Sequence, residues 1–423
     1  MSFPEVPHTL PTRTVRLESL VHGGAALGRD GGRVVFVPFG LPGELVRVSI
    51  VEERTDYLRG RLLEVIEPSP DRVAAPCPYF GACGGCNWQH LAYPAQLEAK
   101  RRIVVEQLER IGKFSAPPVR PTIGSGDPWH YRNQARFSAR RSGHLGFTRS
   151  DQRRFLPIDY CLIMQPPINS VLAELQGRAF GQRLHQVVVR SGARTGDLLV
   201  SPRIGDGLEP VPSGQPFYRE ALLGREFVVS PSSFFQVNTR PETRDLSGVV
   251  PDPPADVSQA ELLVLLARDR LQLTGDDWVV DAYCGVGVFA LLLAPFCAGV
   301  VGIEESASSL RDARANLGDT LNVSFLQAKV EEALPHLEGR LDAIVIDPPR
   351  AGCKPEVLRA ILDRQPRRVF YVSCEPSTLA RDLRVLVDGG YRLDEVQPVD
   401  LFPQTYHIEA CATLVWEGAP ADG

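Results

Sequence analysis

Residues 278–287 read WVVDAYCGVG, a short apolar run that ends in Asp281 and is followed by Gly285 and Gly287. The run predicts a buried strand, and the two glycines predict a turn whose backbone can pass close to a ligand. In open sheets of parallel strands, ligands bind at the carboxyl ends of the strands. This stretch therefore predicts a ligand site where its strand meets the next helix.

Three later runs have the same apolar character and are separated by helical patterns: residues 299–304, 342–347 and 368–373. Near-continuous Val and Ile in such runs indicate a mostly parallel sheet with helices on its faces. We expect a Rossmann-like α/β domain over residues 241–423.

Acidic residues end the strands of this expected sheet. Glu304 lies 23 residues after Asp281, at a position where a carboxylate can accept hydrogen bonds from both hydroxyls of a ribose. A dinucleotide-binding loop would need a third glycine, which is missing here. Asp281 could simply cap the following loop, and Asp347 could be a turn residue before two prolines. Their position at the ligand edge favours an S-adenosylmethionine site, with Gly285 at the point of closest approach.

Cys374 follows the run at 368–373 and is therefore expected at the same edge of the sheet. A buried structural cysteine is the ordinary alternative. A thiolate could add to C6 of uracil, so that C5 can take a methyl group before a base removes the C5 proton. Because a free thiol is only a few per cent ionised at neutral pH, we expect local activation of Cys374. Glu409 is the candidate base, and His407 is its rival.

The first part of the chain has a different pattern. Residues 12–67 alternate polar and apolar side chains between Gly and Pro turns, which predicts a small antiparallel barrel of the oligonucleotide-binding class in a domain over 1–68. Helical spacing of apolar residues predicts a helix over 93–112, which we expect to pack on the catalytic domain. Short strands and turns in the remainder of 69–240 indicate a central α+β domain.

Cys77, Cys83 and Cys86 lie within ten residues of one another. In a reducing compartment, clustered cysteines indicate metal binding or catalysis before disulfides. Three such thiols require a fourth ligand. Four thiolates suit zinc or an iron–sulfur cluster, and the spacing alone does not choose between them.

The net charge of −5 at first argues against a nucleic-acid partner, but the charge is unevenly distributed. Residues 1–160 carry 22 Lys and Arg against 16 Asp and Glu, whereas the remainder carries 24 against 35. Residues 129–154 hold seven Arg, one acid (Asp151) and four interleaved aromatic residues. This composition is typical of a surface that pairs phosphates and stacks bases, although an ordinary solvated Arg-rich sheet is the alternative.

No stretch approaches the roughly 20 apolar residues that cross a bilayer. Residues 1–7 have neither the basic nor the apolar region of a secretory signal. We expect a cytoplasmic monomer with no membrane partner.

Taken together, the motifs resemble the RNA 5-methyluridine (uracil-C5) methyltransferases, specifically the bacterial 23S rRNA branch with an N-terminal TRAM domain and a [4Fe-4S] cluster. The resemblance covers about residues 12–417. It rests on motifs that occur in the family's order and spacing: the cysteine loop 77–86 (C-x5-C-G-G-C), FFQVN at 234–238, the glycine loop at 281–287, DPPR at 347–350, Ser373-Cys374 with Pro376, and the ending with His407 and Glu409.

The resemblance implies a role for individual residues. The cluster ligands would be Cys77, Cys83, Cys86 and Cys161. The cofactor contacts would be Gln236, Tyr283, Glu304, Asp347 and, where the family usually has Asn, Lys329. Cys374 would be the nucleophile and Glu409 the base. Two departures stand out: Glu375 replaces a usual Asn and puts negative charge beside the thiol, and Gln404 replaces a usual His.

The implied activity is methylation of C5 of a uridine in 23S rRNA, with RNA as partner. The same chemistry on the tRNA T-loop uridine is one alternative, and a non-catalytic RNA-binding protein is another. A DNA cytosine-C5 methyltransferase would normally carry a Pro-Cys loop and no cysteine cluster. A radical methylase would need C-x3-C-x2-C spacing, which the cysteine loop does not have.

Overall fold

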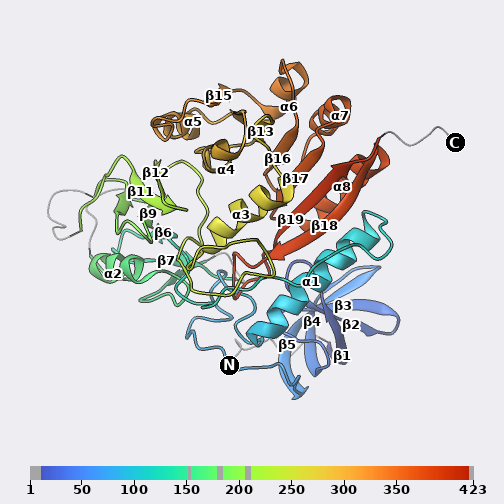
Figure 1. The fold of residues 1–423 in the computed structure, drawn as a ribbon. Coiled ribbons are helices and arrows are strands. Elements are labelled where there is room, and N and C mark those ends of the chain that lie inside the picture. The colour runs from blue at the N-terminus through green and yellow to red at the C-terminus, as the bar shows by residue number, and fades with distance from the viewer. Residues whose placement is uncertain (1–10, 151–153, 179–183, 205–210, 419–423) are drawn as a thin grey trace. The chain divides into compact units, whose positions relative to one another are not determined.

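The computed structural model describes residues 11–150, 154–178, 184–204 and 211–418 (Figure 1). The first ten residues, Asp151 with the rest of 151–153, and the last five residues lie outside the described part. The chain divides into two compact units. Unit 1 comprises residues 1–103, 147–158 and 402–407, and unit 2 comprises 104–146, 159–401 and 408–423. Among the described residues, no helix is both long and apolar enough to cross a membrane.

Unit 1 contains a closed barrel with the strand order β1-β2-β3-β5-β4. Its strands are β1 (Thr12–Leu20), β2 (Ala26–Asp30), β3 (Arg33–Val37), β4 (Leu45–Glu53) and β5 (Tyr57–Glu67). Alternate residues are buried along the strands, as at Val15 and Leu17 of β1, and an irregularity between Leu17 and Ser19 shifts the pattern so that Leu20 is buried as well. The predicted barrel is confirmed.

One pairing in the barrel differs from the antiparallel expectation. β3 and β5 are parallel, with Val35 opposite Leu58. A closed ring of five strands cannot alternate direction all the way round, so at least one pair must be parallel. Helix α1 (Tyr93–Arg110) follows in the chain and agrees with the predicted helix to within two residues.

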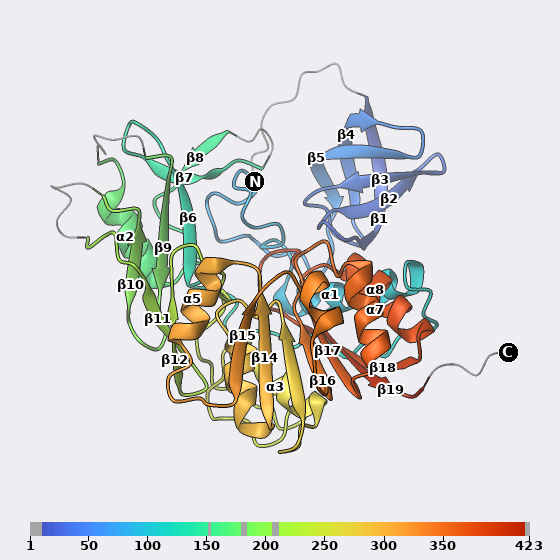
Figure 2. The same ribbon diagram turned by 90° about the horizontal axis from the view of Figure 1, so that it is seen from above.

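The largest sheet belongs to unit 2 and has the order β15-β14-β13-β16-β17-β19-β18 (Figure 2). Its first five strands in that order are parallel, whereas β19 runs antiparallel to both β17 and β18. The predicted mostly parallel sheet is confirmed. Its strands are β13 (Trp278–Ala282), β14 (Gly299–Glu304), β15 (Val323–Gln327), β16 (Ala343–Ile346), β17 (Arg368–Ser373), β18 (Tyr391–Val399) and β19 (Glu409–Trp416).

Helices connect the parallel strands, as the alternating pattern predicts. They are α4 (Val288–Leu293), α5 (Ala307–Ala315), α6 (Val330–Ala333) and α7 (Pro355–Arg364), with the 3-10 turns η1 (Ala294–Phe296) and η2 (Leu334–His336). Helix α3 (Gln259–Leu271) precedes β13, and α8 (Pro376–Asp388) leads from β17 to β18. A capping box begins α3: the Ser258 side chain accepts from the Glu261 amide, and the Glu261 carboxylate accepts from the Ser258 amide.

The preceding part of the chain forms smaller elements. β6 (Gln134–Ala139) pairs with β9 (Gln186–Ser191), which pairs with β10 (Leu198–Ser201). β7 (Leu145–Thr148) and β8 (Phe155–Pro157) extend this sheet, α2 (Pro166–Leu175) lies between β8 and β9 in sequence, and β11 (Tyr218–Leu222) forms a hairpin with β12 (Arg225–Val229).

Candidate active site

The glycine loop after β13 has the tight turn that the sequence predicts. Tyr283, Gly285 and Gly287 all have positive φ, at 66°, 55° and 88°. Glycine adopts this conformation freely, whereas for Tyr283 it is strained. A side chain at Gly287 would also collide with the ring of Phe325, whose ζ carbon would be 2.8 Å from the added Cβ. The turn therefore requires glycine at 287 for space as well as for conformation.

Glu304 ends β14 beside this loop. Its carboxylate accepts the amide hydrogen of Gly285 at 3.0 Å and that of Ser306 at 2.7 Å. The side chain is only half-buried. Glu304 therefore holds the glycine loop in place, and as an acceptor at the end of its strand it is suited to ribose hydroxyls.

Asp281 is 1% exposed. Its two carboxylate oxygens correspond to the two roles that the sequence left open, which are a structural cap and a ligand contact. Its Oδ2 accepts the amide hydrogen of Ala290 at 2.8 Å, which ties it to α4. Its Oδ1 is buried and has no partner among the described residues. Burial, with the nearby charges of Asp347 and Glu304, raises the pKa of Asp281 to about 8. Oδ2 thus stabilises the fold, and Oδ1 can accept a hydrogen bond from a bound ligand.

The thiol and the candidate base come together through the strand register. Ser373 pairs with Ala410 across β17 and β19, so the next residue, Cys374, lies across from Glu409. Glu409 is 3% exposed, and burial with the neighbouring Asp347 raises the pKa of its carboxyl well above the ordinary value. Burial also raises the pKa of Asp347, to about 7. A carboxyl group whose pKa is raised in this way must lose its proton before it can act as a base, and its carboxylate then accepts a proton more strongly.

The expected activation of the thiol is not what the structure shows. Burial and the charges of Glu409 and Asp347 raise the pKa of Cys374 to about 11. Arg350 acts in the opposite direction, through its charge and a hydrogen bond to the thiol. Because Glu409 and Asp347 have raised pKa values themselves, their repulsion of a thiolate weakens when they are protonated. The expectation was wrong because Glu409 and Asp347, which are distant from Cys374 in sequence, lie near its thiol in the fold.

Comparison with known proteins decides the family. Residues 243–416 match the model for tRNA (uracil-5-)-methyltransferases, and residues 11–63 match the TRAM domain. Proteins named as RNA methyltransferases from Halalkalibacterium halodurans and Gloeobacter violaceus are each 38% identical to the chain, over 95% of it and 96% of their own length. The chain belongs to the RNA uracil-5 methyltransferase family.

A solved structure of this uracil-5 methyltransferase family has a similar fold. The tRNA (uracil-54, C5)-methyltransferase of Pyrococcus abyssi, in complex with S-adenosyl-L-homocysteine, superposes with a TM-score of 0.72 at 25% identity. The superposition covers 95% of the present chain and 100% of the archaeal one. The predicted fold class, a TRAM barrel followed by a Rossmann-like methyltransferase domain, is therefore confirmed.

The two further cofactor residues implied by the uracil-5 methyltransferase family lie at different places in unit 2. Gln236 is half-buried in the segment between β12 and α3, where its backbone carbonyl accepts from the Asn133 side-chain amide at 3.1 Å. Lys329 precedes α6, is about half exposed and pairs with Glu332 at 3.4 Å. Lys329 is thus engaged on its own helix in this structure.

Both departures from the family pattern have partners in the structure. The Glu375 carboxylate accepts from the Ser377 hydroxyl at 2.7 Å, in the first turn of α8. The Gln404 side-chain oxygen accepts from Gln96 at 3.0 Å, and the Gln404 amide donates to the Gln96 side-chain oxygen at 3.0 Å. Gln404 therefore anchors its loop to α1. Another polar residue at this position could make similar hydrogen bonds.

The four candidate cluster cysteines are divided between the units. Cys77, Cys83 and Cys86 lie in the unit 1 loop between β5 and α1, and Cys161 lies in unit 2 before α2. The Gly85 amide donates to the Cys83 sulfur at 3.4 Å, and burial raises the pKa of both Cys77 and Cys83. Among the residues that the structure describes, no group of three or more His, Cys, Asp or Glu side chains is arranged to hold a metal ion.

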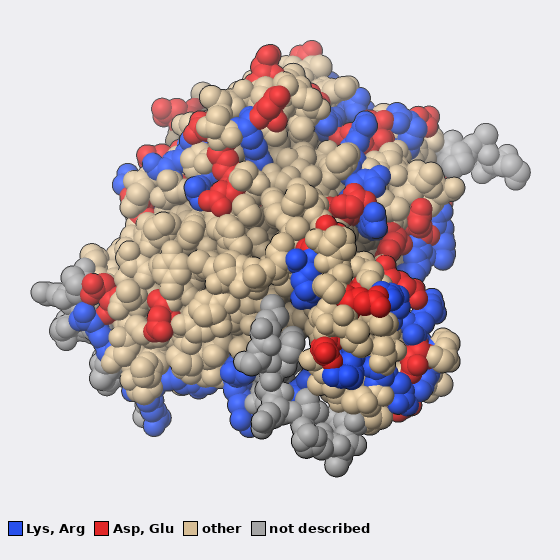
Figure 3. All heavy atoms as spheres, turned by 90° about the horizontal axis from the view of Figure 1, so that it is seen from below, with Lys and Arg blue, Asp and Glu red and all other residues tan. Residues whose placement is uncertain are grey.

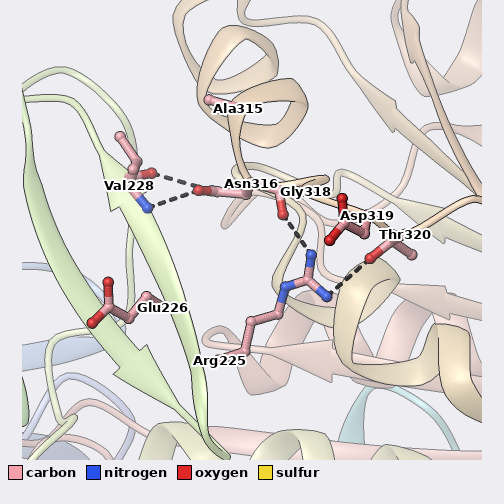
Figure 4. A pocket seen from close by; sticks show the side chains of 8 residues that line it. All are labelled: Arg225, Glu226, Val228, Ala315, Asn316, Gly318, Asp319 and Thr320. Atoms are coloured by element: carbon pink, nitrogen blue, oxygen red, sulfur yellow. Dashed lines mark hydrogen bonds between the residues drawn. The ribbon is translucent and has the colours of Figure 1, made fainter.

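A groove of about 540 Å³ opens between β12 and the end of α5 (Figure 4). Arg225 crosses it and donates to the carbonyls of Asn316 at 2.5 Å and Leu317 at 2.9 Å. This arrangement caps the carboxyl end of α5. None of the residues that line the groove is a predicted site residue. The guanidinium of Arg225 is already hydrogen-bonded to backbone carbonyls of the protein.

Sequence reasoning missed Arg350 and Asp382. Arg350 belongs to the DPPR motif, so its place beside Asp347 was visible, but its contact with Cys374 depends on how two loops meet. Asp382 lies in the interior of α8, where nothing in the local pattern separates it from a surface acid.

Proposed function

We propose that this protein methylates C5 of a uridine in 23S rRNA with S-adenosylmethionine, through a covalent bond between the Cys374 sulfur and C6 of the uracil. The proposal rests on one observation above all: the register of β17 and β19 sets a thiol across from a buried carboxyl group at the ligand edge of the sheet. A nucleophile and a base are the two groups that this reaction requires from the protein.

The residues fit an adenosine-containing cofactor. The glycine loop gives backbone access, the Glu304 carboxylate ends β14 half-exposed, and Asp281 has a buried oxygen without a partner among the described residues. Asp347 lies near both Asp281 and Cys374. The cofactor supplies the methyl group as an electrophile. We propose Gln236, Tyr283, Gly285 and Lys329 as further contacts, as the family resemblance implies.

The chemistry of the protein groups follows from their positions. The Cys374 thiolate, held by Arg350, adds to C6 and makes C5 electron-rich. After C5 has gained the methyl group, the Glu409 carboxylate accepts the C5 proton, the C6–sulfur bond breaks, and Cys374 leaves as the thiolate. The apolar surroundings that raise the pKa of Glu409 make its carboxylate a stronger base for this step.

Two observations bear on the substrate RNA, and they favour different candidates. The TRAM barrel together with the cysteine cluster favours 23S rRNA, as in the family branch that the chain resembles. The structural similarity to a tRNA (uracil-54, C5)-methyltransferase favours a tRNA T-loop uridine as the second candidate. Mass spectrometry of rRNA and tRNA from a deletion strain tests both: we expect 5-methyluridine to disappear from 23S rRNA, and its loss from tRNA alone would contradict the first candidate.

RNA contacts are proposed for the barrel of unit 1 and for the arginines of residues 129–154. Basic and acidic side chains are interspersed on the face in Figure 3, and a wide part of that face carries neither. Attraction by a general basic field is therefore weak on that face. Among individual arginines, Arg136 on β6 is exposed, and we propose that it supplies a phosphate contact. We further propose a cytoplasmic monomer.

The [4Fe-4S] cluster on Cys77, Cys83, Cys86 and Cys161 remains a proposal that the family resemblance carries. In its support, three of the thiols share one loop, and the Gly85 amide already donates to the Cys83 sulfur. Amide-to-sulfur hydrogen bonds are a feature of iron–sulfur sites.

A further inference from the structure

Helix α8 holds the loop that follows β16. The Thr378 hydroxyl donates to the Arg350 carbonyl at 3.2 Å, and the Arg381 guanidinium donates to the Ala351 carbonyl at 3.0 Å. Thr378 and Arg381 are three residues apart and therefore share one face of the helix. Two consecutive backbone carbonyls of the loop are thus bound to the first turns of α8.

Asp382 completes this face and is fully buried. Its Oδ2 accepts the amide hydrogen of Cys353 at 2.8 Å and the hydroxyl hydrogen of Tyr371, on β17, at 2.7 Å. Its Oδ1 accepts from Arg381 at 2.8 Å. One carboxylate therefore links α8, strand β17 and the loop after β16, and it does so with charge-assisted bonds in a dry environment.

The fit leaves no room for a side chain in the loop. Gly352 has φ of 77°, and an added Cβ would lie 2.6 Å from Asp382 Oδ2 and 2.6 Å from the Arg381 guanidinium. Such distances are closer than any real Cβ contact. The loop thus reaches its position only with glycine at this residue and Asp382 beneath it.

The same loop carries Arg350, whose guanidinium bonds to the Cys374 thiol. Helix α8 begins at Pro376, two residues after that thiol. The one hydroxyl hydrogen of Thr378 is shared between the Arg350 carbonyl and the Glu375 carbonyl, which lies at 3.1 Å, so the hydroxyl contacts both the segment with Arg350 and the segment with Cys374. The two segments are tied together at a single side chain.

We propose that Asp382, assisted by Thr378, is a positioning residue that holds the 350–353 loop against α8 and so keeps Arg350 on the Cys374 thiol. The inference rests on the proposed function, since it concerns activation of the proposed nucleophile. A clamp of this kind would orient the activating cation without touching RNA or cofactor.

The test measures the reactivity of the Cys374 thiol directly. The full-length protein is treated with iodoacetamide over a range of pH, and the alkylation rate of the peptide that contains Cys374 is followed by mass spectrometry. Asp382→Asn keeps the shape but removes the charge, and Thr378→Val removes only the hydroxyl. Asp388→Asn is the matched control, because it makes the same change in the same helix at a residue whose side chain is 67% exposed.

We expect Asp382→Asn to slow alkylation at pH 8 by about five- to tenfold and to move the rate–pH profile to higher pH, because a displaced Arg350 no longer stabilises the thiolate. Thr378→Val should act in the same direction with a smaller effect, and Asp388→Asn should match the wild type. In an Arg350→Ala background, Asp382→Asn should cause no further change, since both act through one contact.

Unchanged profiles in both Asp382→Asn and Thr378→Val would overturn the proposal, as would an equal effect of Asp382→Asn with and without Arg350. If Asp382→Asn fails to fold, Thr378→Val decides. Alkylation needs no turnover, so the outcome is separate from that of the proposed function, which fails if Cys374→Ala still methylates RNA.

Discussion

Cys374 directly follows Ser373, which pairs with Ala410 at the end of the β17–β19 ladder, and the charge of the neighbouring Glu409 contributes to the raised pKa of the thiol. The two groups are 35 positions apart in sequence and meet only because β19 returns antiparallel beside β17. The charge of Glu409 favours the neutral thiol, whereas burial and the charge of Asp347 favour the neutral carboxyl of Glu409. Substrate and cofactor binding must therefore change this balance before the thiolate can attack.

Cys374→Ala should abolish methyl transfer, with a loss of at least about a thousandfold, because no other group would form the bond to C6. RNA and cofactor binding should be largely retained. RNA that contains 5-fluorouridine should trap a covalent adduct with the wild type and none with the variant, as seen by denaturing gel. Cys297→Ala, at a buried cysteine near η1, is the control. Retained turnover in Cys374→Ala would end the assignment.

Glu409→Gln should accumulate the protein–RNA adduct, because addition and methylation can proceed while removal of the C5 proton stalls. Single-turnover experiments with labelled methyl donor should show the methyl group retained on protein-bound RNA. His407→Asn serves as the comparison, since His407 is the rival base. Normal release of methylated RNA by Glu409→Gln, with a stalled His407 variant, would reverse the two roles.

Asp281→Asn should stabilise the fold at alkaline pH. The folded pKa of Asp281, about 8, lies above the unfolded value near 4, so its contribution to stability is present below about pH 4 and is lost as the pH rises through 8. Removing the ionisable group should raise stability at pH 8 by up to about 5 kcal/mol, the full linkage of a difference of about four pKa units, and should weaken cofactor binding.

Thermal unfolding at pH 5 and pH 8 measures this effect, with the exposed Asp276→Asn as control. An Asp281→Asn variant that is no more stable than wild type at pH 8 would mean that Asp281 is not buried as a neutral acid.

Anaerobically purified protein should be brown and contain about four irons per chain. Cys83→Ser should lose both the colour and the iron, whereas Cys411→Ser, at a buried cysteine of β19, should keep them. Metal analysis of the two variants side by side makes the comparison. Stoichiometric zinc with no iron under the same handling would favour the zinc alternative.

Removal of residues 1–68 should weaken RNA binding and flatten its dependence on salt, with cofactor affinity little changed, because the barrel would take its phosphate contacts with it. Arg136→Ala should act similarly on a smaller scale, and the exposed Arg340→Ala should not. Binding of an rRNA fragment at several salt concentrations gives the slopes. An unchanged slope after truncation would make the barrel a stability module.

The sequence was sufficient where a local pattern carries the information. The WVVDAYCGVG stretch predicted β13 and its glycine turn, and the end of each apolar run predicted the place of Glu304, Asp347 and Cys374. The elements were predictable because strand burial and turn chemistry depend on neighbouring residues.

Long-range relationships were less accessible. The raised pKa of Cys374 depends on Glu409 and Asp347, which reach the thiol from other strands. The parallel pairing of β3 with β5 follows from closure of a five-membered ring, which no single strand reveals. Asp382 has a local pattern like that of any helix acid, and only packing shows that it joins three elements.

Closure of the β1–β5 ring also has a meaning for how this protein meets other molecules. A sheet with a first and a last strand offers unsatisfied amides and carbonyls along its borders, where a foreign strand can dock. The ring has no such border, since every strand has two neighbours. A partner must therefore bind the barrel through its side chains and turns. Substitutions at those positions can change the binding preference of the barrel while its strand pairing stays the same.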